Sequence, residues 1–279
     1  MKINLAKSAG FCFGVRRALT IALNTARRSQ KIYMLGDIVH NEEVIKQIRS
    51  AGINKINRLA KGKNKILIIR AHGCDIKTLQ KAKSLGYKVI DATCPMVKEI
   101  HKIARDAEKN GYQIIVIGDK EHDEVHGIVG QLKNKAIVID ETRNIPFKNI
   151  KLIKKAAVIV QSTQNMEKAF RIVGLLKPYI NDLKFFNTIC KPTRIKQSEI
   201  KTMPLENDVM IIIGSKNSAN TRRLFEIAKS LNKRSYWVSS KKEINPRWFK
   251  NVNCVGVSAG ASTPETTIQE VIKYIKRIS

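Results

Sequence analysis

Several features that are common in proteins are absent from this sequence, and each absence excludes a class of function. No two of the five cysteines form a CxxC pair, so zinc-ribbon and thioredoxin-like motifs are excluded. Neither a Walker motif nor a GxGxxG fingerprint occurs, which disfavours nucleotide binding. The longest apolar runs, such as residues 209–213, are too short to span a bilayer, and the first residues contain no signal-peptide core. We therefore expect a cytoplasmic protein without a membrane segment.

Acidic and aromatic residues are also scarce. The chain has 52 Lys and Arg against 23 Asp and Glu, a net charge of +29, and 6% aromatic residues. Such an excess of positive charge is typical of nucleic-acid-binding proteins, but a drift of composition toward Lys, Ile and Asn also produces it. Because the basic residues are spread along the chain and stacking residues are few, we favour drift and expect no nucleic-acid partner. A basic surface would still attract an acidic protein or an anionic substrate.

Short apolar runs alternate with helical patterns along the whole chain. Apolar runs occupy residues 32–35, 66–69, 114–117 and 209–213, and helical patterns occupy residues 15–29, 77–85 and 95–110. This alternation predicts an α/β fold with parallel sheets and right-handed crossovers. Three evenly spaced cysteines suggest three small α/β modules, at residues 13–93, 94–188 and 189–279.

Three cysteines stand where a predicted strand passes into a helix. Cys94 follows an apolar run that reads as a buried strand and precedes Pro95, which suits a first helical turn; Cys12 and Cys190 have comparable neighbours. The free N–H groups of a helix start favour a thiolate. We expect these three cysteines to hold one 4Fe–4S cluster with one open iron that can bind a substrate oxygen. Zinc bound by three cysteines and a histidine is the competing site.

The remaining cysteines and two of the histidines carry weaker signals. Cys254 lies in an apolar run and is predicted to be a buried small hydrophobic residue. For Cys74 the sequence leaves a buried and a functional role equally open. His101 and His126 fit helix surfaces.

Polar side chains follow the ends of the predicted strands, where ligands bind in open α/β sheets. They are His40, His72, His122, Glu124, Ser162, Thr163, Ser218, Asn220 and Ser262. A single histidine after a strand is commonly structural. Here three of the five histidines follow predicted strands, which favours a functional role. Hydroxyls, an amide and free N–H groups at a helix start can hold a phosphate, although ordinary helix capping would use the same residues. We expect a diphosphate site, with Glu124 supplying protons.

A set of longer motifs runs through nearly the whole chain. They are Gly10-Phe11-Cys12-Phe13-Gly14-Val15, Val39-His40-Asn41, Ala71-His72-Gly73, Asp91-Ala92-Thr93-Cys94-Pro95, His122 with Glu124, Gly214-Ser215-Lys216-Asn217-Ser218 and Ala259-Gly260-Ala261-Ser262. In these motifs and their order the sequence resembles the 4-hydroxy-3-methylbut-2-enyl diphosphate reductase (IspH/LytB) family. The resemblance implies a trefoil of three α/β modules around a central cluster, with residues 1–12 joining the third module. It also implies two-electron reductive dehydroxylation of the allylic alcohol to isopentenyl and dimethylallyl diphosphate, the last step of the methylerythritol phosphate route.

The resemblance also implies a role for each site residue. Cys12, Cys94 and Cys190 would be the cluster ligands, and Glu124 the proton source. The diphosphate would contact His40, His72, His122, Ser218, Asn220 and Ser262, while Ser162, with Thr163 beside it, would lie near the substrate hydroxyl. An acidic flavodoxin or ferredoxin would dock on the basic surface and deliver electrons.

The sequence departs from the family's pattern at a few of these loops. Serine replaces the usual threonine at Ser162, alanine replaces a common serine at Ala219, aspartate replaces a common proline at Asp37 and Asp123, and Lys191-Pro192 is unusual after the third cysteine. These changes bear on substrate affinity and loop geometry. Two other functions remain open: a basic binding protein with a structural metal site, and a metal-free phosphatase that uses the serine turns but gives the cysteines no role.

Overall fold

The computed structural model describes residues 1–29 and 31–278; Gln30 and Ser279, which fall in the first and third expected modules, lie outside the described residues. Its strands are β1 (Lys2–Leu5), β2 (Ile32–Leu35), β3 (Ile53–Ile56), β4 (Ile66–Ile69), β5 (Lys88–Asp91), β6 (Gln113–Ile117), β7 (Ile137–Ile139), β8 (Lys155–Val160), β9 (Asp182–Phe186), β10 (Val209–Ile213), β11 (Ser235–Val238) and β12 (Cys254–Ala259). They form three four-stranded sheets. The predicted α/β class with parallel sheets is therefore confirmed.

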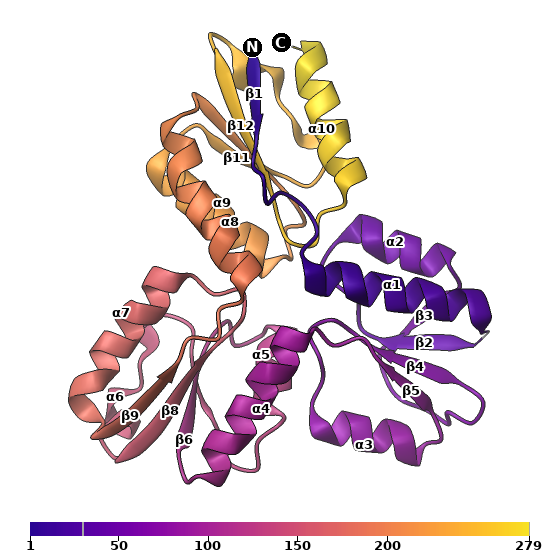
Figure 1. Ribbon diagram of the computed structural model, residues 1–279, viewed down its shortest axis with the longest axis vertical. Coiled ribbons are helices and arrows are strands. Elements are labelled where there is room, and N and C mark those ends of the chain that lie inside the picture. The colour runs from indigo at the N-terminus through magenta and orange to yellow at the C-terminus, as the bar shows by residue number, and fades with distance from the viewer. Residues whose placement is uncertain (30, 279) are drawn as a thin grey trace. The chain divides into compact units, whose positions relative to one another are not determined.

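Each sheet repeats the same strand order. The orders are β3-β2-β4-β5, β7-β6-β8-β9 and β11-β10-β12-β1, and every strand pairing of the described chain is parallel. If the four strands of each of the first two sheets are numbered in chain order, their order across the sheet is second, first, third, fourth. In the last sheet β1 takes the fourth place, with Ile3 beside Val255, and Figure 1 shows this indigo strand next to yellow α10. The first residues of the chain and its last strand therefore share one sheet.

The central strands are continuous apolar runs because helices cover both of their faces. All five residues of β10 and the last five of β8 are buried. β5 differs, since it is an edge strand and Val89 and Ile90 are only half-buried, so the prediction of a buried strand before Cys94 was wrong. β3 escaped prediction because two of its four residues are exposed and polar.

Ten α-helices are described. They are α1 (Phe13–Arg28), α2 (Glu42–Ser50), α3 (Ile76–Ser84), α4 (Pro95–Lys109), α5 (Asp123–Val129), α6 (Phe147–Ile150), α7 (Met166–Leu176), α8 (Lys191–Thr202), α9 (Ala219–Leu231) and α10 (Glu265–Ile278). Side chains of Asp75, Asn165 and Ser218 cap α3, α7 and α9 by accepting hydrogen bonds from N–H groups of the first turn. Among the described helices, none has the length and hydropathy to cross a membrane.

The chain divides into two compact units. One comprises Met1–Arg16, Val39–Gln47 and Lys191–Ser279, with the β11-β10-β12-β1 sheet; the other comprises Arg17–Ile38 and Ile48–Cys190, with the other two sheets. Within the second unit, the Ile76 N–H donates to the Gly130 carbonyl at 3.2 Å and the Gln131 amide donates to the Cys74 carbonyl at 2.9 Å, which joins its two sheets. The expected module boundaries stay predictions.

Candidate functional site

The predicted polar residues follow the same two strands in every sheet. The first and third strands lie side by side, and their outgoing connections diverge to form the crevice in which α/β proteins bind ligands. The fifth residue after each first strand is His40, His122 or Ser218. The third residue after each third strand is His72, Thr163 or Ser262. Each sheet therefore carries a polar pair at the same edge of its crevice.

The three predicted cysteine ligands follow the fourth strand of each sheet. Cys94 comes after β5, Cys190 after β9 and Cys12 after β1, and each directly precedes the first residue of a helix. Pro95 occupies the first turn of α4 as predicted, and the Cys94 side chain makes no capping hydrogen bond. All three are half-buried and lie outside any disulfide. The positive end of a helix dipole favours the negative charge that a metal-bound thiolate carries.

Glu124 is a buried carboxylate in the first turn of α5 in the second unit. Its side chain is 1% exposed, and it accepts hydrogen bonds from the Ser162 N–H at 2.6 Å and the Ser162 hydroxyl at 2.7 Å. His122 precedes α5, and its Nδ1 accepts a hydrogen bond from the Glu124 N–H at 3.1 Å. The Cys190 N–H donates to the Ser162 carbonyl at 3.1 Å. The sequence-predicted acid, serine and third cysteine thus form one hydrogen-bonded group.

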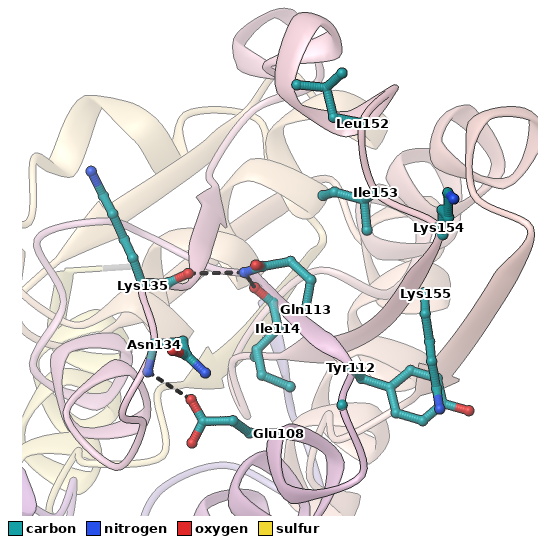
Figure 2. A pocket seen from close by; sticks show the side chains of 11 residues that line it. Glu108, Tyr112, Gln113, Ile114, Asn134, Lys135, Leu152, Ile153, Lys154 and Lys155 are labelled. Atoms are coloured by element: carbon teal, nitrogen blue, oxygen red, sulfur yellow. Dashed lines mark hydrogen bonds between the residues drawn. The ribbon is translucent and has the colours of Figure 1, made fainter.

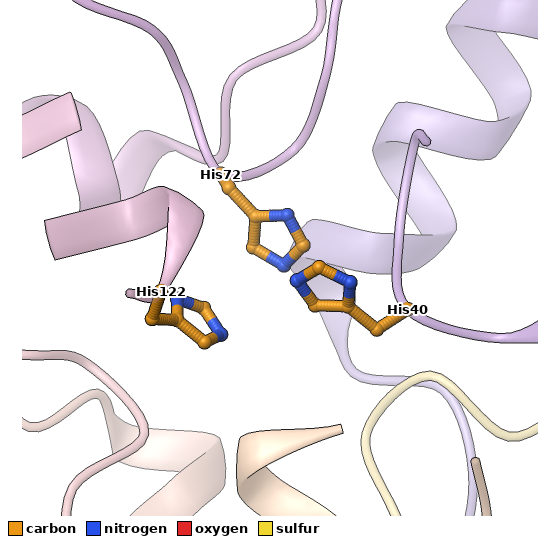
Figure 3. Close-up of side chains that lie close together, drawn as sticks. All are labelled: His40, His72 and His122. Atoms are coloured by element: carbon orange, nitrogen blue, oxygen red, sulfur yellow. The ribbon is translucent and has the colours of Figure 1, made fainter. Parts of the chain in front are cut away.

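His72 and His122 also meet in the second unit. Their rings lie edge to face, and the ring centroids are 5.4 Å apart. Figure 3 draws both side chains. His40, drawn in the same figure, belongs to the other unit. Two imidazoles at this spacing offer donors to one anionic group, as the sequence predicted for both.

His101 lies behind the His72 loop, and its predicted place on a helix surface was wrong. The ring is 6% exposed, and its Cε1 is 2.9 Å from the position that a Cβ on Gly73 would take. Burial, followed by the charge of Arg105, lowers the pKa of His101 to about 4, so the ring is neutral at neutral pH. Its Nε2 has no hydrogen-bond partner among the described residues. His126 is exposed on α5 as predicted.

The two aspartates that replace common prolines are ion-paired. Asp123 lies 2.6 Å from the guanidinium of Arg70 at the end of β4, and Asp37 lies 2.8 Å from the ammonium of Lys55. The Arg70–Asp123 pair connects the loop that carries His72 with the helix that carries Glu124. It therefore joins the two sheets of the second unit next to their polar residues.

In the first unit, a cluster of hydrogen-bonding groups surrounds the start of α9. Ser218 caps this helix by accepting from the Thr221 N–H at 3.3 Å. Asn220 is 4% exposed, and its Nδ2 has no partner within residues 1–29 and 31–278. Ser262 donates its hydroxyl to the His40 carbonyl at 3.2 Å. A buried amide donor without a protein partner at a helix N-terminus is what an anionic ligand would satisfy.

Two glycines permit this close packing. A Cβ on Gly214, whose φ is +153°, would lie 2.5 Å from the Thr221 Oγ1, and a Cβ on Gly260 would clash with the same atom. Thr221 is fully buried between these turns. Ser215, in the first turn, donates its hydroxyl to the Glu42 carboxylate at 2.8 Å. The predicted phosphate-holding turns are therefore packed against each other through small residues.

Lys196 is a site residue that the sequence analysis missed. It is 2% exposed in α8, and its ammonium donates to the carbonyls of Ser8, Gly10 at 3.0 Å and Ala259 at 3.2 Å. Burial lowers the pKa of Lys196 to about 8, while Cys12 and Glu199 act in the opposite direction. The sequence shows only a lysine six residues after Cys190, and a lysine on the protein surface would give the same pattern.

Neither of the two cysteines outside the predicted ligand set directly precedes a described helix. Burial, with the charges of Asp75 and Asp91, raises the pKa of Cys74 to about 12, so this thiol stays protonated. Cys254 opens β12 and is only half-buried, with its Sγ 3.6 Å from an Asp208 carboxylate oxygen, so the prediction of full burial was wrong.

A cavity of about 470 Å³ lies at the opposite end of the second unit's β6 and β8 (Figure 2). Its lining includes Gln113 and Lys155, the first residues of these strands, together with Tyr112. The Lys155 ammonium lies 4.2 Å from the centroid of the Tyr112 ring. Because the polar pairs follow the other ends of the strands, this cavity is separate from the candidate site.

Comparison with known proteins agrees with this geometry. A family model described as LytB protein matches residues 3–276. Proteins named 4-hydroxy-3-methylbut-2-enyl diphosphate reductase are similar over their lengths: one from Aquifex aeolicus is 39% identical (99% of this chain, 96% of the relative), and one from Campylobacter fetus subsp. fetus is also 39% identical (100% and 99%).

Two solved structures have the same fold. The reductase from Plasmodium falciparum is similar with a TM-score of 0.89 and 28% identity, covering 98% of this chain and 87% of that one. Another, described as the terminal enzyme of the non-mevalonate pathway, has a TM-score of 0.73 and 37% identity, covering 99% and 100%. The chain belongs to the LytB protein family.

Proposed function

We propose that this protein is a 4-hydroxy-3-methylbut-2-enyl diphosphate reductase. It removes the allylic hydroxyl of its substrate with two electrons and two protons, releasing water and forming isopentenyl and dimethylallyl diphosphate. The observation that carries the proposal is the repeated position of Cys12, Cys94 and Cys190, each after the fourth strand of a sheet and before a helix. Family membership supports the same reaction.

The three thiols would hold a 4Fe–4S cluster with one iron free of protein ligands. The donor set fits this group, because iron–sulfur clusters are bound by thiolates and each cysteine lies at a helix start that favours one. Such a cluster would supply the electrons and an open iron for the substrate oxygen.

His40, His72, His122, Ser218, Asn220 and Ser262 would bind the diphosphate. The free donor of Asn220 and the start of α9 support this role in the first unit. The adjacent rings of His72 and His122 support it in the second. Only the backbone N–H of Ala219 is left to replace the hydroxyl of the serine that is common at that position.

Glu124 would deliver protons to the leaving hydroxyl and the allylic fragment. Its burial keeps bulk water from competing, and its two hydrogen bonds from Ser162 fix the direction of the carboxyl group. The Ser162 hydroxyl can pass a proton from water to Glu124, and Thr163 lies beside it. An acidic flavodoxin or ferredoxin would supply electrons, and the expected cytoplasmic location is part of this proposal.

The test is anaerobic purification followed by iron and sulfide analysis, EPR spectroscopy and substrate turnover with a chemical reductant. The proposal expects close to four iron and four sulfide per chain, and both diphosphate products. Stoichiometric zinc without sulfide, or cluster-containing protein that leaves the substrate unchanged, would overturn it. Phosphate release without reduction would instead establish the phosphatase alternative.

A further inference from the structure

α8 connects the third cysteine to the loop that carries the first. The helix begins at Lys191, directly after Cys190, and its buried face includes Lys196. Lys196 donates to the carbonyls of Ser8 and Gly10 in the loop between β1 and α1. Cys12 lies two residues after Gly10 in that loop. A side chain of α8 therefore fixes the backbone that leads into Cys12.

Glu199, one turn later in α8, binds a backbone N–H of the same loop. Its carboxylate accepts hydrogen bonds from the Ser8 N–H at 3.0 Å and from the Ser8 hydroxyl. Lys196 holds the carbonyl of the same residue, so both backbone groups of Ser8 are bound by charged side chains. Hydrogen bonds to charged groups are stronger than neutral ones, which makes this an effective clamp.

Lys196 also reaches the opposite side of the Cys12 loop. Its third acceptor is the carbonyl of Ala259, the last residue of β12, whose following turn carries Ser262. The Cys12 N–H donates to the Ala261 carbonyl in that turn at 3.1 Å. The ammonium thus uses its three donors on three carbonyls, and it ties the loop of a predicted cluster ligand to the turn of a predicted diphosphate ligand.

Burying a lysine ammonium destabilises the folded state unless hydrogen bonds or an opposite charge compensate for the lost water. We propose that Lys196, clamped with Glu199, is the positioning residue of Cys12 and places a positive charge beside the iron–sulfur cluster. This inference rests on the proposed function. The tripod of carbonyls suits an ammonium, whereas the planar fork of an arginine cannot point at all three.

The test compares Lys196→Met with Lys201→Met, which removes an exposed lysine from the same helix. The variants are purified anaerobically, and the measurements are cluster loss to an iron chelator, the EPR signal and the reduction potential. Lys196→Met should lose its cluster about 10- to 100-fold faster, because removing a residue that supports a metal ligand typically lowers metal affinity by about that factor. Its potential should become more negative, because a cation no longer favours the reduced cluster. Lys201→Met should behave as wild type.

Two further variants separate positioning from a general loss of stability. Glu199→Gln keeps an acceptor for the Ser8 N–H but weakens the clamp, so it should accelerate cluster loss less than Lys196→Met and change the potential in the opposite direction. Lys196→Arg should restore the charge and the potential but not the full retention of the cluster. Should Lys196→Met fail to fold, these two variants carry the test. If the wild-type protein holds no cluster, the proposed function is overturned. If the Lys196 and Glu199 variants hold a cluster whose EPR signal, reduction potential and retention are those of wild type, this inference alone is overturned.

Discussion

Both oxygens of the Glu124 carboxylate accept a hydrogen bond from Ser162, one from its N–H and one from its hydroxyl. The pair joins the start of α5 to the turn after β8, so the first and third strands of one sheet supply the two partners. A buried carboxylate held by two donors has a fixed orientation, which is the geometry that directed proton transfer requires.

Glu124→Gln should lower kcat by at least about 100-fold, because an amide cannot donate an acidic proton. The amide keeps the shape and one acceptor, so substrate affinity should change little. Single-turnover kinetics with a chemical reductant measure the step without a donor protein. A variant that turns over at the wild-type rate would show that another group carries the proton.

Ser162→Ala tests the partner of this carboxylate. It removes the hydroxyl but keeps the backbone N–H bond, so kcat should fall by roughly 10-fold, the value of one hydrogen bond to a charged group. Ser162→Thr keeps the hydroxyl and restores the residue usual in the family, so it should retain wild-type kcat. Equal rates in all three proteins would remove Ser162 from the proton path.

The five cysteines should separate into two classes. Replacing Cys12, Cys94 or Cys190 by serine should abolish or destabilise the cluster, while Cys74→Ser and Cys254→Ser should retain iron, sulfide and the visible spectrum. In metal-free protein at pH 8, Cys74 should resist alkylation because its raised pKa keeps the thiol protonated. Mass-spectrometric mapping of the alkylated cysteines measures this. Rapid labelling of Cys74, or cluster loss in Cys74→Ser, would contradict the assignment.

The sequence predicts most of this fold and site because both are local patterns repeated along the chain. An apolar run followed by a polar turn and a helix identifies the ends of strands, and this pattern placed Glu124, Ser162 and the three cysteines after strands, where the structure has them. The local pattern could not show that β1 takes the fourth place in the last sheet, since that depends on pairing with β12 some 250 residues away; only the family resemblance implied that residues 1–12 join the third module.

The wrong predictions of burial have a physical cause, which is that burial depends on tertiary packing. A lysine or a histidine reads as a surface residue, and only tertiary packing reveals that Lys196 and His101 are buried. Edge strands give the opposite error. β5 lies at the edge of its sheet and has a neighbouring strand on one side only, so its apolar residues are half-buried although the sequence predicts a buried strand.

The burial of His101 predicts an acid-sensitive stability. Its pKa is lowered from 6.5 to about 4 by burial, with Arg105 acting in the same direction and Asp91 opposing it. Below pH 6.5 the unfolded chain therefore binds a proton that the folded chain does not, and stability falls as the pH drops from 6.5 to 4. The loss from this one group is on the order of 3 kcal/mol.

His101→Leu should flatten this part of the pH profile, because leucine does not titrate. The measurement is the free energy of unfolding of the metal-free protein by urea between pH 4 and 7. Lys102→Leu, an exposed change on the same helix, is the control and should follow wild type. Parallel profiles for His101→Leu and wild type would mean that folding leaves the pKa of the His101 ring unchanged.

The Arg70–Asp123 ion pair should stabilise the second unit and position its polar residues. Both side chains are partly buried, at 19% and 27% exposure, so the pair is less screened than one on the surface. A double-mutant cycle with Arg70→Met and Asp123→Asn should give a coupling energy of about 1 kcal/mol in urea unfolding. Both single variants should also raise KM more than they lower kcat, since they loosen the loops of His72 and His122. Additive effects on stability would show that the two charges act independently.

The net charge of +29 predicts how the electron donor docks. If the donor is an acidic flavodoxin or ferredoxin, as proposed, its attraction to this positive charge would speed their encounter at low salt and would be screened as the Debye length shortens, from about 10 Å at 0.1 M to about 3 Å at 1 M. Turnover with the donor protein below saturation should therefore fall steeply as ionic strength rises. Turnover with a small chemical reductant is the control, because any salt effect on the substrate or the site appears there too. The informative quantity is the ratio of the two rates, measured at several salt concentrations with the same enzyme preparation. A ratio that is independent of salt would mean that the basic surface is compositional drift with no role in docking.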